Sequence, residues 1–185
     1  MTKEMTIKTI NPANEEIIQE YDVISEEEIK EKVKNAKNAF NEWKKDFNKR
    51  SFYLVTLAEE FSKNKEELAQ ICTTEMGKTI KESRSEVEKC IWAMKYYADN
   101  GKIFAKEEII NADARKSTIA FEPLGVIASI MPWNFPYWQA LRFASPSLMI
   151  GNTSILKPSS KTIQCGLKIQ EMFKKAGVPE GVFQT

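Results

Sequence analysis

Two apolar, strand-like runs on either side of a mostly apolar helix form the central pattern of this 185-residue chain. Residues 126–131 carry no charge and are rich in β-branched side chains, which is typical of a parallel strand covered on both faces. Residues 135–150 are long enough for a buried helix that stops at Gly151, and residues 153–156 predict the next short strand. This order predicts a right-handed βαβ unit and an α/β fold.

Polar residues follow both predicted strands. They form two short segments, Pro132-Trp133-Asn134 and Lys157-Pro158-Ser159-Ser160. Ligands of open parallel sheets bind at the carboxyl ends of the strands. The pattern therefore predicts a ligand site at these two segments.

The N-terminal half predicts a hairpin followed by four amphipathic helices. The hairpin is expected from β-prone runs at residues 5–10 and 17–23. Ser25 and Glu28 form a capping-box pattern, after which apolar side chains recur at helical spacing as far as Phe47. The later helices are expected around residues 54–61, from Asn64 to Met76, and around residues 87–98, the last ending at Asn100-Gly101.

Residues 111–122 change to a period of two and are too polar for a central strand. This run predicts an edge or excursion strand, and an exposed edge invites pairing with another chain. After the βαβ unit, Ser160 or Thr162 can cap a further helix, which Gly177 ends. A new strand is expected to begin at residue 182.

The composition excludes several classes of protein. With 42% hydrophobic and 29% charged residues the chain is globular, and its net charge of +1, with acids and bases interspersed, predicts no nucleic-acid or membrane partner. The N-terminus lacks the apolar core of a signal peptide, and no apolar run is long enough to span a membrane, so a cytoplasmic location is expected. Histidine is absent and the three cysteines have no metal-site spacing, which argues against a metal centre within this chain.

Three residues near the predicted ligand edge are candidates for chemistry. The amide of Asn134 can donate to a developing oxyanion, although a turn or capping role explains its position equally well. Lys157 suits a phosphate or ribose hydroxyl, although a surface lysine beside a capped helix is the simpler alternative. Arg142 lies in an otherwise apolar helix and needs a partner, either a ligand carboxylate or an internal salt bridge.

The segment EPLGVIASIMPWNFPYWQALRFASPSLMIGNTSILKPSS resembles the coenzyme-domain signature of the aldehyde dehydrogenase superfamily. Three other motifs occur in the family's order. They are Asn11-Pro12-Ala13, Glu75-Met76-Gly77-Lys78 and Ala176-Gly177-Val178-Pro179-Glu180-Gly181-Val182. The resemblance implies N-terminal helices and part of a Rossmann-like parallel sheet, with an excursion at residues 111–123 that serves as an oligomerisation strand in a homo-oligomer.

The resemblance also implies residue roles. Asn134 matches the oxyanion-hole asparagine, and Lys157, with Pro158 and Ser159 beside it, matches the lysine that binds the adenosine ribose. The nicotinamide side of the coenzyme cleft is matched by Ile130, Met131, Pro132 and Trp133.

The likeness extends to coenzyme and substrate preference. Many NAD-specific relatives carry a glutamate where this chain has Ser160, so NADP⁺ is the expected coenzyme, with NAD⁺ possible. The sequence around residues 132–152 is similar to the succinate-semialdehyde dehydrogenase branch. Trp138 would then form an apolar wall, and Arg142 would grip the distal carboxylate of a short aldehyde.

One departure from the family pattern limits the expected activity. In family members the catalytic cysteine, the general-base glutamate and the glycine turn lie beyond the position at which this chain ends. Cys72, Cys90 and Cys165 match none of them and are expected to be buried structural thiols. The chain is therefore expected to be the N-terminal part of a coenzyme-binding domain, inactive alone. The alternative is an inactive fragment that only binds nucleotide or self-associates.

Overall fold

The computed structural model describes residues 6–185, so Met5 of the predicted hairpin lies outside the described residues. This part of the chain contains six helices and seven strands. In order they are β1 Thr6–Ile10, β2 Ile17–Asp22, α1 Glu26–Trp43, α2 Phe47–Lys63, α3 Lys65–Met76, α4 Ile80–Phe104, β3 Glu108–Ile110, β4 Ser117–Ile119, β5 Val126–Ile130, α5 Pro136–Ile150, β6 Thr153–Lys157, α6 Ile163–Lys175 and β7 Phe183–Gln184. None of these helices is both long and apolar enough to cross a membrane.

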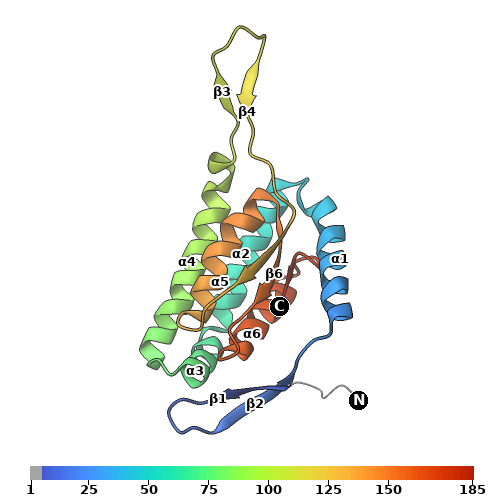
Figure 1. Cartoon of the computed structure of the whole chain (residues 1–185). Helices are drawn as coiled ribbons and strands as arrows, with labels where there is room; N and C mark the ends of the chain where they lie inside the picture. The colour runs from blue at the N-terminus through green and yellow to red at the C-terminus, as the bar shows by residue number, and fades with distance from the viewer. Residues whose placement is uncertain (1–5) are drawn as a thin grey trace.

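A three-stranded parallel sheet in the order β5-β6-β7 confirms the predicted βαβ unit. Val126 pairs with Thr153 and Ile130 with Lys157, so β5 and β6 end side by side. Helix α1 contacts all three strands. Helix α5 contacts β6, and helix α6 contacts β7 (Figure 1). The hydroxyl of Thr153 donates to the Ala36 carbonyl at 3.1 Å, which fixes α1 against the sheet.

The hydrophobic core lies where α2, α4 and α5 pack together (Figure 1). Phe61 and Tyr137 meet edge to face in this core, and the Tyr137 hydroxyl donates to the Leu68 carbonyl at 3.0 Å. Complete burial of such side chains contributes about 1.5 to 3 kcal/mol each. The same packing holds α5 directly against α4, and both helices bear site residues.

The first helix ends at Trp43, so the prediction that it continues to Phe47 is wrong. Asp46 starts a new helix, because its carboxylate accepts a hydrogen bond from the Lys49 amide at 3.1 Å. Phe47 is the first residue of α2 and packs against the core from there. Its spacing from Trp43 happened to continue the apolar pattern of α1.

Helix α4 runs through Asn100-Gly101 to Phe104, so the predicted stop at this pair is also wrong. Gly101 is buried, and a Cβ atom there would lie 3.3 Å from both Met149 and Phe47. The glycine therefore permits close packing of α4 on α5 and α2. In contrast, the predicted stop at Gly151 is confirmed, since this residue ends α5 with φ +112°.

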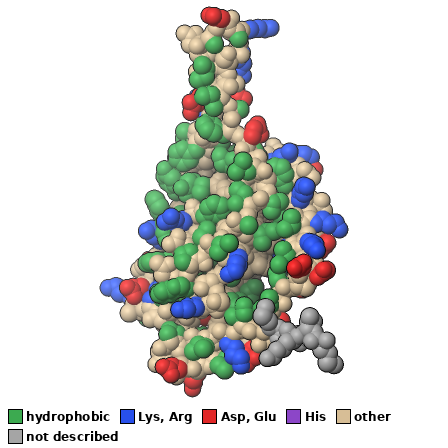
Figure 2. All heavy atoms as spheres, viewed as in Figure 1, with side chains coloured by type: hydrophobic (Ala, Val, Ile, Leu, Met, Phe, Trp, Pro, Cys, Tyr) green, Lys and Arg blue, Asp and Glu red, His purple; other side chains and the backbone are tan. Residues whose placement is uncertain are grey.

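The polar run at residues 111–122 belongs to a hairpin that projects from the body of the molecule (Figure 1). It is not a single strand, because residues 111–116 form the turn between β3 and β4. Ile109 and Ile119 of this hairpin are exposed. Hydrophobic side chains also gather below the hairpin (Figure 2), where α4 exposes Trp92, Tyr96, Ile103 and Phe104.

Candidate active site

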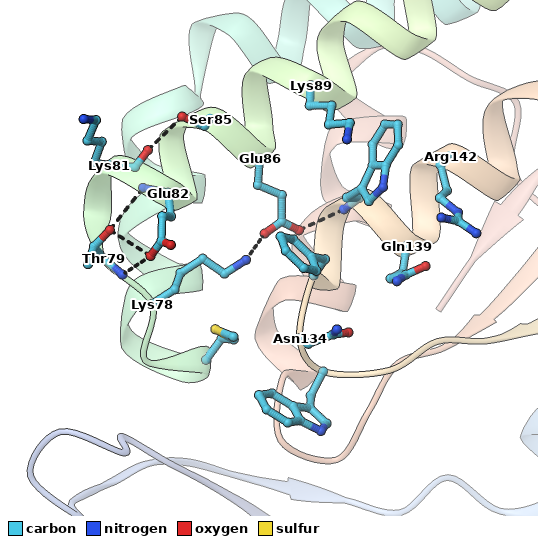
Figure 3. Close-up of a pocket in the computed structure, with 14 residues that line it drawn as sticks. Lys78, Thr79, Lys81, Glu82, Ser85, Glu86, Lys89, Asn134, Gln139 and Arg142 are labelled. Atoms are coloured by element: carbon cyan, nitrogen blue, oxygen red, sulfur yellow. Dashed lines mark hydrogen bonds and ion pairs between the residues drawn. The ribbon is translucent and has the colours of Figure 1, made fainter.

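A groove of about 880 Å³ lies between the first half of α4 and the start of α5 (Figure 3). This volume is within the range of small-molecule sites. Its lining combines aromatic rings with amide and charged side chains. The lining residues are Met76, Lys78, Thr79, Lys81, Glu82, Ser85, Glu86, Lys89, Trp133, Asn134, Phe135, Trp138, Gln139 and Arg142.

Asn134 lies on the loop between β5 and α5, on the wall of this groove (Figure 3). Its Oδ1 atom is buried and has no hydrogen-bond partner among the described residues. A turn or capping asparagine would use this oxygen to accept a backbone N–H. The geometry therefore argues against the turn or capping alternative and leaves the amide available to a ligand.

Trp138 and Arg142 lie four residues apart on α5 and line the same groove as Asn134, which lies on the loop before this helix. Trp138 is half-buried, and the Lys89 ammonium lies 4.3 Å from the centre of its ring. Arg142 is exposed and forms no ion pair within residues 6–185, so the internal salt bridge considered from the sequence is not present there. Lys89 has no carboxylate partner there either, which leaves two cations free at this end of the groove.

The start of α5 is held by a buried ion pair that the sequence analysis missed. One oxygen of Glu86, Oε1, accepts the amide hydrogens of Tyr137 and Trp138, each at 2.9 Å. The other oxygen pairs with the Lys78 ammonium (Figure 3). The Glu86 side chain is 1% exposed and the Lys78 side chain 6%. The sequence signal was the position of Glu86 among the buried residues Ser83, Val87 and Cys90 on one face of α4.

The predicted coenzyme residues lie at one edge of the sheet. The Met131 amide donates to the Lys157 carbonyl at 3.1 Å, so the segments that follow β5 and β6 are neighbours. The Lys157 ammonium is exposed, and its hydrogen-bond partner within residues 6–185 is the Pro158 carbonyl. Ile130 is 75% exposed at the same edge. An apolar strand end beside an exposed ammonium is suited to the nicotinamide and to the ribose or phosphate of a dinucleotide.

A second hollow of about 460 Å³ adjoins this edge, between the β1–β2 hairpin and the start of α6. Ser160, Lys161 and Thr162 line it. Trp133 lines both hollows and so stands between the coenzyme edge and the groove that contains Asn134.

The N-terminus of α6 already holds a carboxylate of the same chain, so it is not open to a ligand anion. The Glu75 carboxylate already accepts the amide hydrogens of Gln164 and Cys165, each at 2.9 Å. Neither Ser160 nor Thr162 caps the helix with its side chain. Burial raises the pKa of the Glu75 carboxyl, and the two N–H donors lower it in part. The signal for Glu75 was its helical spacing from the apolar residues Leu68 and Cys72.

Comparison with known proteins shows the family of this chain. The family model of the aldehyde dehydrogenase family matches residues 1–185. The chain belongs to the aldehyde dehydrogenase family. It is 42% identical over 182 residues to a probable NADP(+) succinate-semialdehyde dehydrogenase of Synechocystis, and 37% identical over 186 residues to an NADP(+) succinate-semialdehyde dehydrogenase of Mycobacterium avium. Each match covers 98% of this chain, which spans 40% and 39% of the two relatives' lengths.

Solved structures of aldehyde dehydrogenases have the same fold as this chain. The crystal structure of succinic semialdehyde dehydrogenase from Streptococcus pyogenes in complex with NADP⁺ has a TM-score of 0.92 and 27% identity, over 96% of this chain and 40% of that one. An aldehyde dehydrogenase from Brucella melitensis has a TM-score of 0.92 and 31% identity, over 98% and 38%. These likenesses confirm the predicted α/β fold with part of a Rossmann-like sheet.

The three cysteines of this aldehyde dehydrogenase chain are all buried and unpaired. Burial raises the pKa of the Cys90 and Cys165 thiols well above the ordinary value. A nucleophilic cysteine needs the opposite environment, because the thiolate is the reactive form. Neither hollow is lined by a cysteine.

Proposed function

We propose that this chain forms the oxyanion site, the substrate-carboxylate site and the coenzyme edge of an NADP⁺-dependent aldehyde dehydrogenase. The aldehyde would be short and end in a carboxylate, with succinate semialdehyde the best fit. The overall reaction converts aldehyde, NADP⁺ and water into carboxylic acid, NADPH and a proton. The thiolate that attacks the aldehyde and the base that activates water are assigned to a part of the enzyme that this chain does not span.

The amide of Asn134 would stabilise the negative charge that develops on the aldehyde oxygen when the thiolate adds to the carbon. An amide donor aimed at such an oxyanion typically contributes about 3 to 4 kcal/mol to the transition state. The position of Asn134 on the wall of the groove supports this role.

Arg142 would bind the carboxylate at the far end of the aldehyde, with Trp138 as an apolar wall along the chain between them. Lys89 adds a second positive charge beside Trp138. A charge-assisted hydrogen bond to a carboxylate contributes about 1.5 to 3 kcal/mol. The observation that carries the proposal is that Arg142 faces the groove that contains Asn134 and pairs with no carboxylate of residues 6–185.

The coenzyme would bind at the edge formed by residues 130–133 and 157–160 and accept the hydride from the aldehyde carbon. Lys157 and the uncharged Ser160 favour a ribose 2′-phosphate, which agrees with the NADP(+) in the names of the relatives. Since Glu75 occupies the N-terminus of α6, this preference rests on Lys157 and on the missing carboxylate at position 160, not on the helix dipole.

The test uses the full-length protein that carries this chain. Arg142→Ala should lower kcat/KM for succinate semialdehyde by roughly ten- to a hundred-fold and should leave kcat/KM for butanal almost unchanged. Butanal has the same number of carbons, with a methyl group in place of the carboxylate, so it is the matched control substrate. An equal loss on both aldehydes would refute the assignment of Arg142, and the absence of aldehyde oxidation in the parent protein would refute the proposed function.

A further inference from the structure

The start of α5 lacks a cap from its own sequence. Phe135 occupies the N-cap position and has no side-chain acceptor, and Pro136 opens the helix without an amide hydrogen. The next two amides, of Tyr137 and Trp138, would be unsatisfied donors in a largely buried place. Both donate to Glu86, a residue of another helix about 50 positions earlier in the sequence.

Lys78 contacts the same helix start from the other side. Its ammonium pairs with Glu86, and it lies 4.2 Å from the centre of the Phe135 ring. Phe135 directly follows Asn134, and Tyr137 and Trp138 follow within one turn. The ion pair therefore contacts the backbone or side chain of three of the four residues after Asn134 (Figure 3).

We propose that Glu86, held in place by Lys78, is a positioning residue for the oxyanion-binding amide of Asn134. The inference rests on the proposed function of Asn134. A displacement of about 1 Å in a reacting or stabilising group can cost as much as a hundred-fold in rate. A buried carboxylate that fixes two successive amides of α5 limits such movement, while its other oxygen is neutralised by Lys78.

Glu75 provides a matched comparison within the same chain. It is also a buried glutamate, and it also accepts two successive amide hydrogens at the start of a helix. Its helix is α6, which follows the coenzyme segment instead of the Asn134 loop. Loss of Glu75 should therefore disturb stability and coenzyme binding without acting through Asn134.

The decisive experiment is a double-mutant cycle in the full-length protein. Glu86→Ala should lower kcat for succinate semialdehyde by roughly ten- to a hundred-fold, and Asn134→Ala by roughly a hundred- to a thousand-fold. If Glu86 acts through Asn134, the double variant should have the kcat of Asn134→Ala alone. Losses that multiply in the double variant would overturn the proposal. Glu75→Ala combined with Asn134→Ala is the control in which the losses should multiply.

Amide hydrogen exchange gives a reading that is independent of catalysis. In Glu86→Ala the backbone amides of Tyr137 and Trp138 should exchange faster than in the parent protein, whereas exchange at the backbone amide of Gln164 should not change. Unchanged exchange at Tyr137 and Trp138 would also overturn the proposal. If Asn134→Ala keeps the parent kcat, the proposed function of Asn134 fails, and the exchange rates still decide whether Glu86 holds this helix start.

A second variant covers the case in which Glu86→Ala does not fold. Glu86→Gln combined with Lys78→Met keeps an acceptor oxygen for the two amides and removes both buried charges. This variant should fold, protect the two amides and have a higher kcat than Glu86→Ala combined with Lys78→Met, which lacks the acceptor oxygen. If it protects the amides but its kcat is no higher than that of this second double variant, Glu86 does not position Asn134.

Discussion

Single buried polar residues set most of the geometry around the site. Glu75 and Glu86 each satisfy two backbone amides at the start of a helix. Arg50 has the converse role, since its guanidinium donates to the carbonyls of Trp43, Lys44 and Met149 at the ends of α1 and α5. Buried charges are costly unless they are hydrogen-bonded. Here each buried charge forms hydrogen bonds with backbone groups at a helix end that would otherwise be unsatisfied.

Ser160 is the residue through which coenzyme preference can be tested. Ser160→Glu places a carboxylate close to Lys157, where it can accept from ribose hydroxyls and repel a 2′-phosphate. In the full-length protein we expect the ratio of kcat/KM for NADP⁺ to that for NAD⁺ to fall by at least roughly ten-fold, the effect of a single charged interaction of about 1.5 kcal/mol. Ser160→Gln is the matched uncharged control. The same ratio in Ser160→Glu and in the parent would rule out this basis for selectivity.

The sequence points to candidate site residues more directly than to the residues that support them. Asn134 and Lys157 are candidates because they follow apolar strands, and Arg142 because it interrupts an apolar helix face. Glu86 and Lys78 were missed because a pair eight residues apart in a charged segment resembles a solvated helix face. Glu86 shares a face of α4 with apolar residues, but the burial of the ion pair depends on how α5 packs against α4, which the local pattern does not show.

At the scale of elements, the sequence identified the main helices and the central strands, and most errors were in boundaries. The pattern that ran through Phe47 hid a break at Asp46, because two consecutive helices happened to share one apolar spacing. Gly101 was interpreted as a stop, although its lack of a Cβ atom serves helix packing against Met149. In both cases a tertiary contact, not the local propensity, decides the outcome.

The cap on α6 predicts a specific dependence of stability on pH. Burial raises the pKa of Glu75 above its ordinary value of 4.5, so the folded state holds this proton more tightly than the unfolded state. Its contribution to stability is greatest below pH 4.5 and is lost as the pH rises through the raised pKa. The melting temperature of the parent, relative to that of Glu75→Gln, should therefore fall as the pH rises above 4.5.

Glu82→Gln is the control, because the contribution of Glu82 to stability should depend on pH in the opposite direction. Hydrogen bonds from Thr79 lower the pKa of Glu82, so its contribution is present above pH 4.5 and is lost as the pH falls through the lowered value. Melting curves that depend on pH in the same way for the parent and Glu75→Gln would contradict the assigned role of Glu75.

At the scale of the whole molecule, the projecting β3–β4 hairpin and the apolar surface below it are the main exposed features (Figures 1 and 2). We propose that the hairpin pairs with another subunit in a homo-oligomer. Ile109 is 81% exposed and Ile119 46%, and both lie on this projecting hairpin. A free strand edge of this kind is normally covered.

Subunit association tests this proposal. In the full-length protein Ile109→Lys should weaken association by roughly ten- to a hundred-fold, because burial of one isoleucine contributes about 1.5 to 3 kcal/mol. Analytical ultracentrifugation over a range of concentrations would measure the change. Asp113→Lys, in the turn of the same hairpin, is the control for added charge and should have a smaller effect. Identical association constants for the parent and Ile109→Lys would place the interface elsewhere.

The two glutamate caps also separate the residues that we assign to selectivity from the residues that hold the backbone of the site in place. Arg142 and Ser160, which we assign to choice of aldehyde and coenzyme, lie on exposed surfaces and form no part of either cap. The residues that hold the starts of α5 and α6 come from the turn between α3 and α4 and from the adjoining ends of these two helices. Substitutions at positions 142 and 160 can therefore alter selectivity while the starts of α5 and α6 keep their shape. One fold can then change its aldehyde or coenzyme through single substitutions.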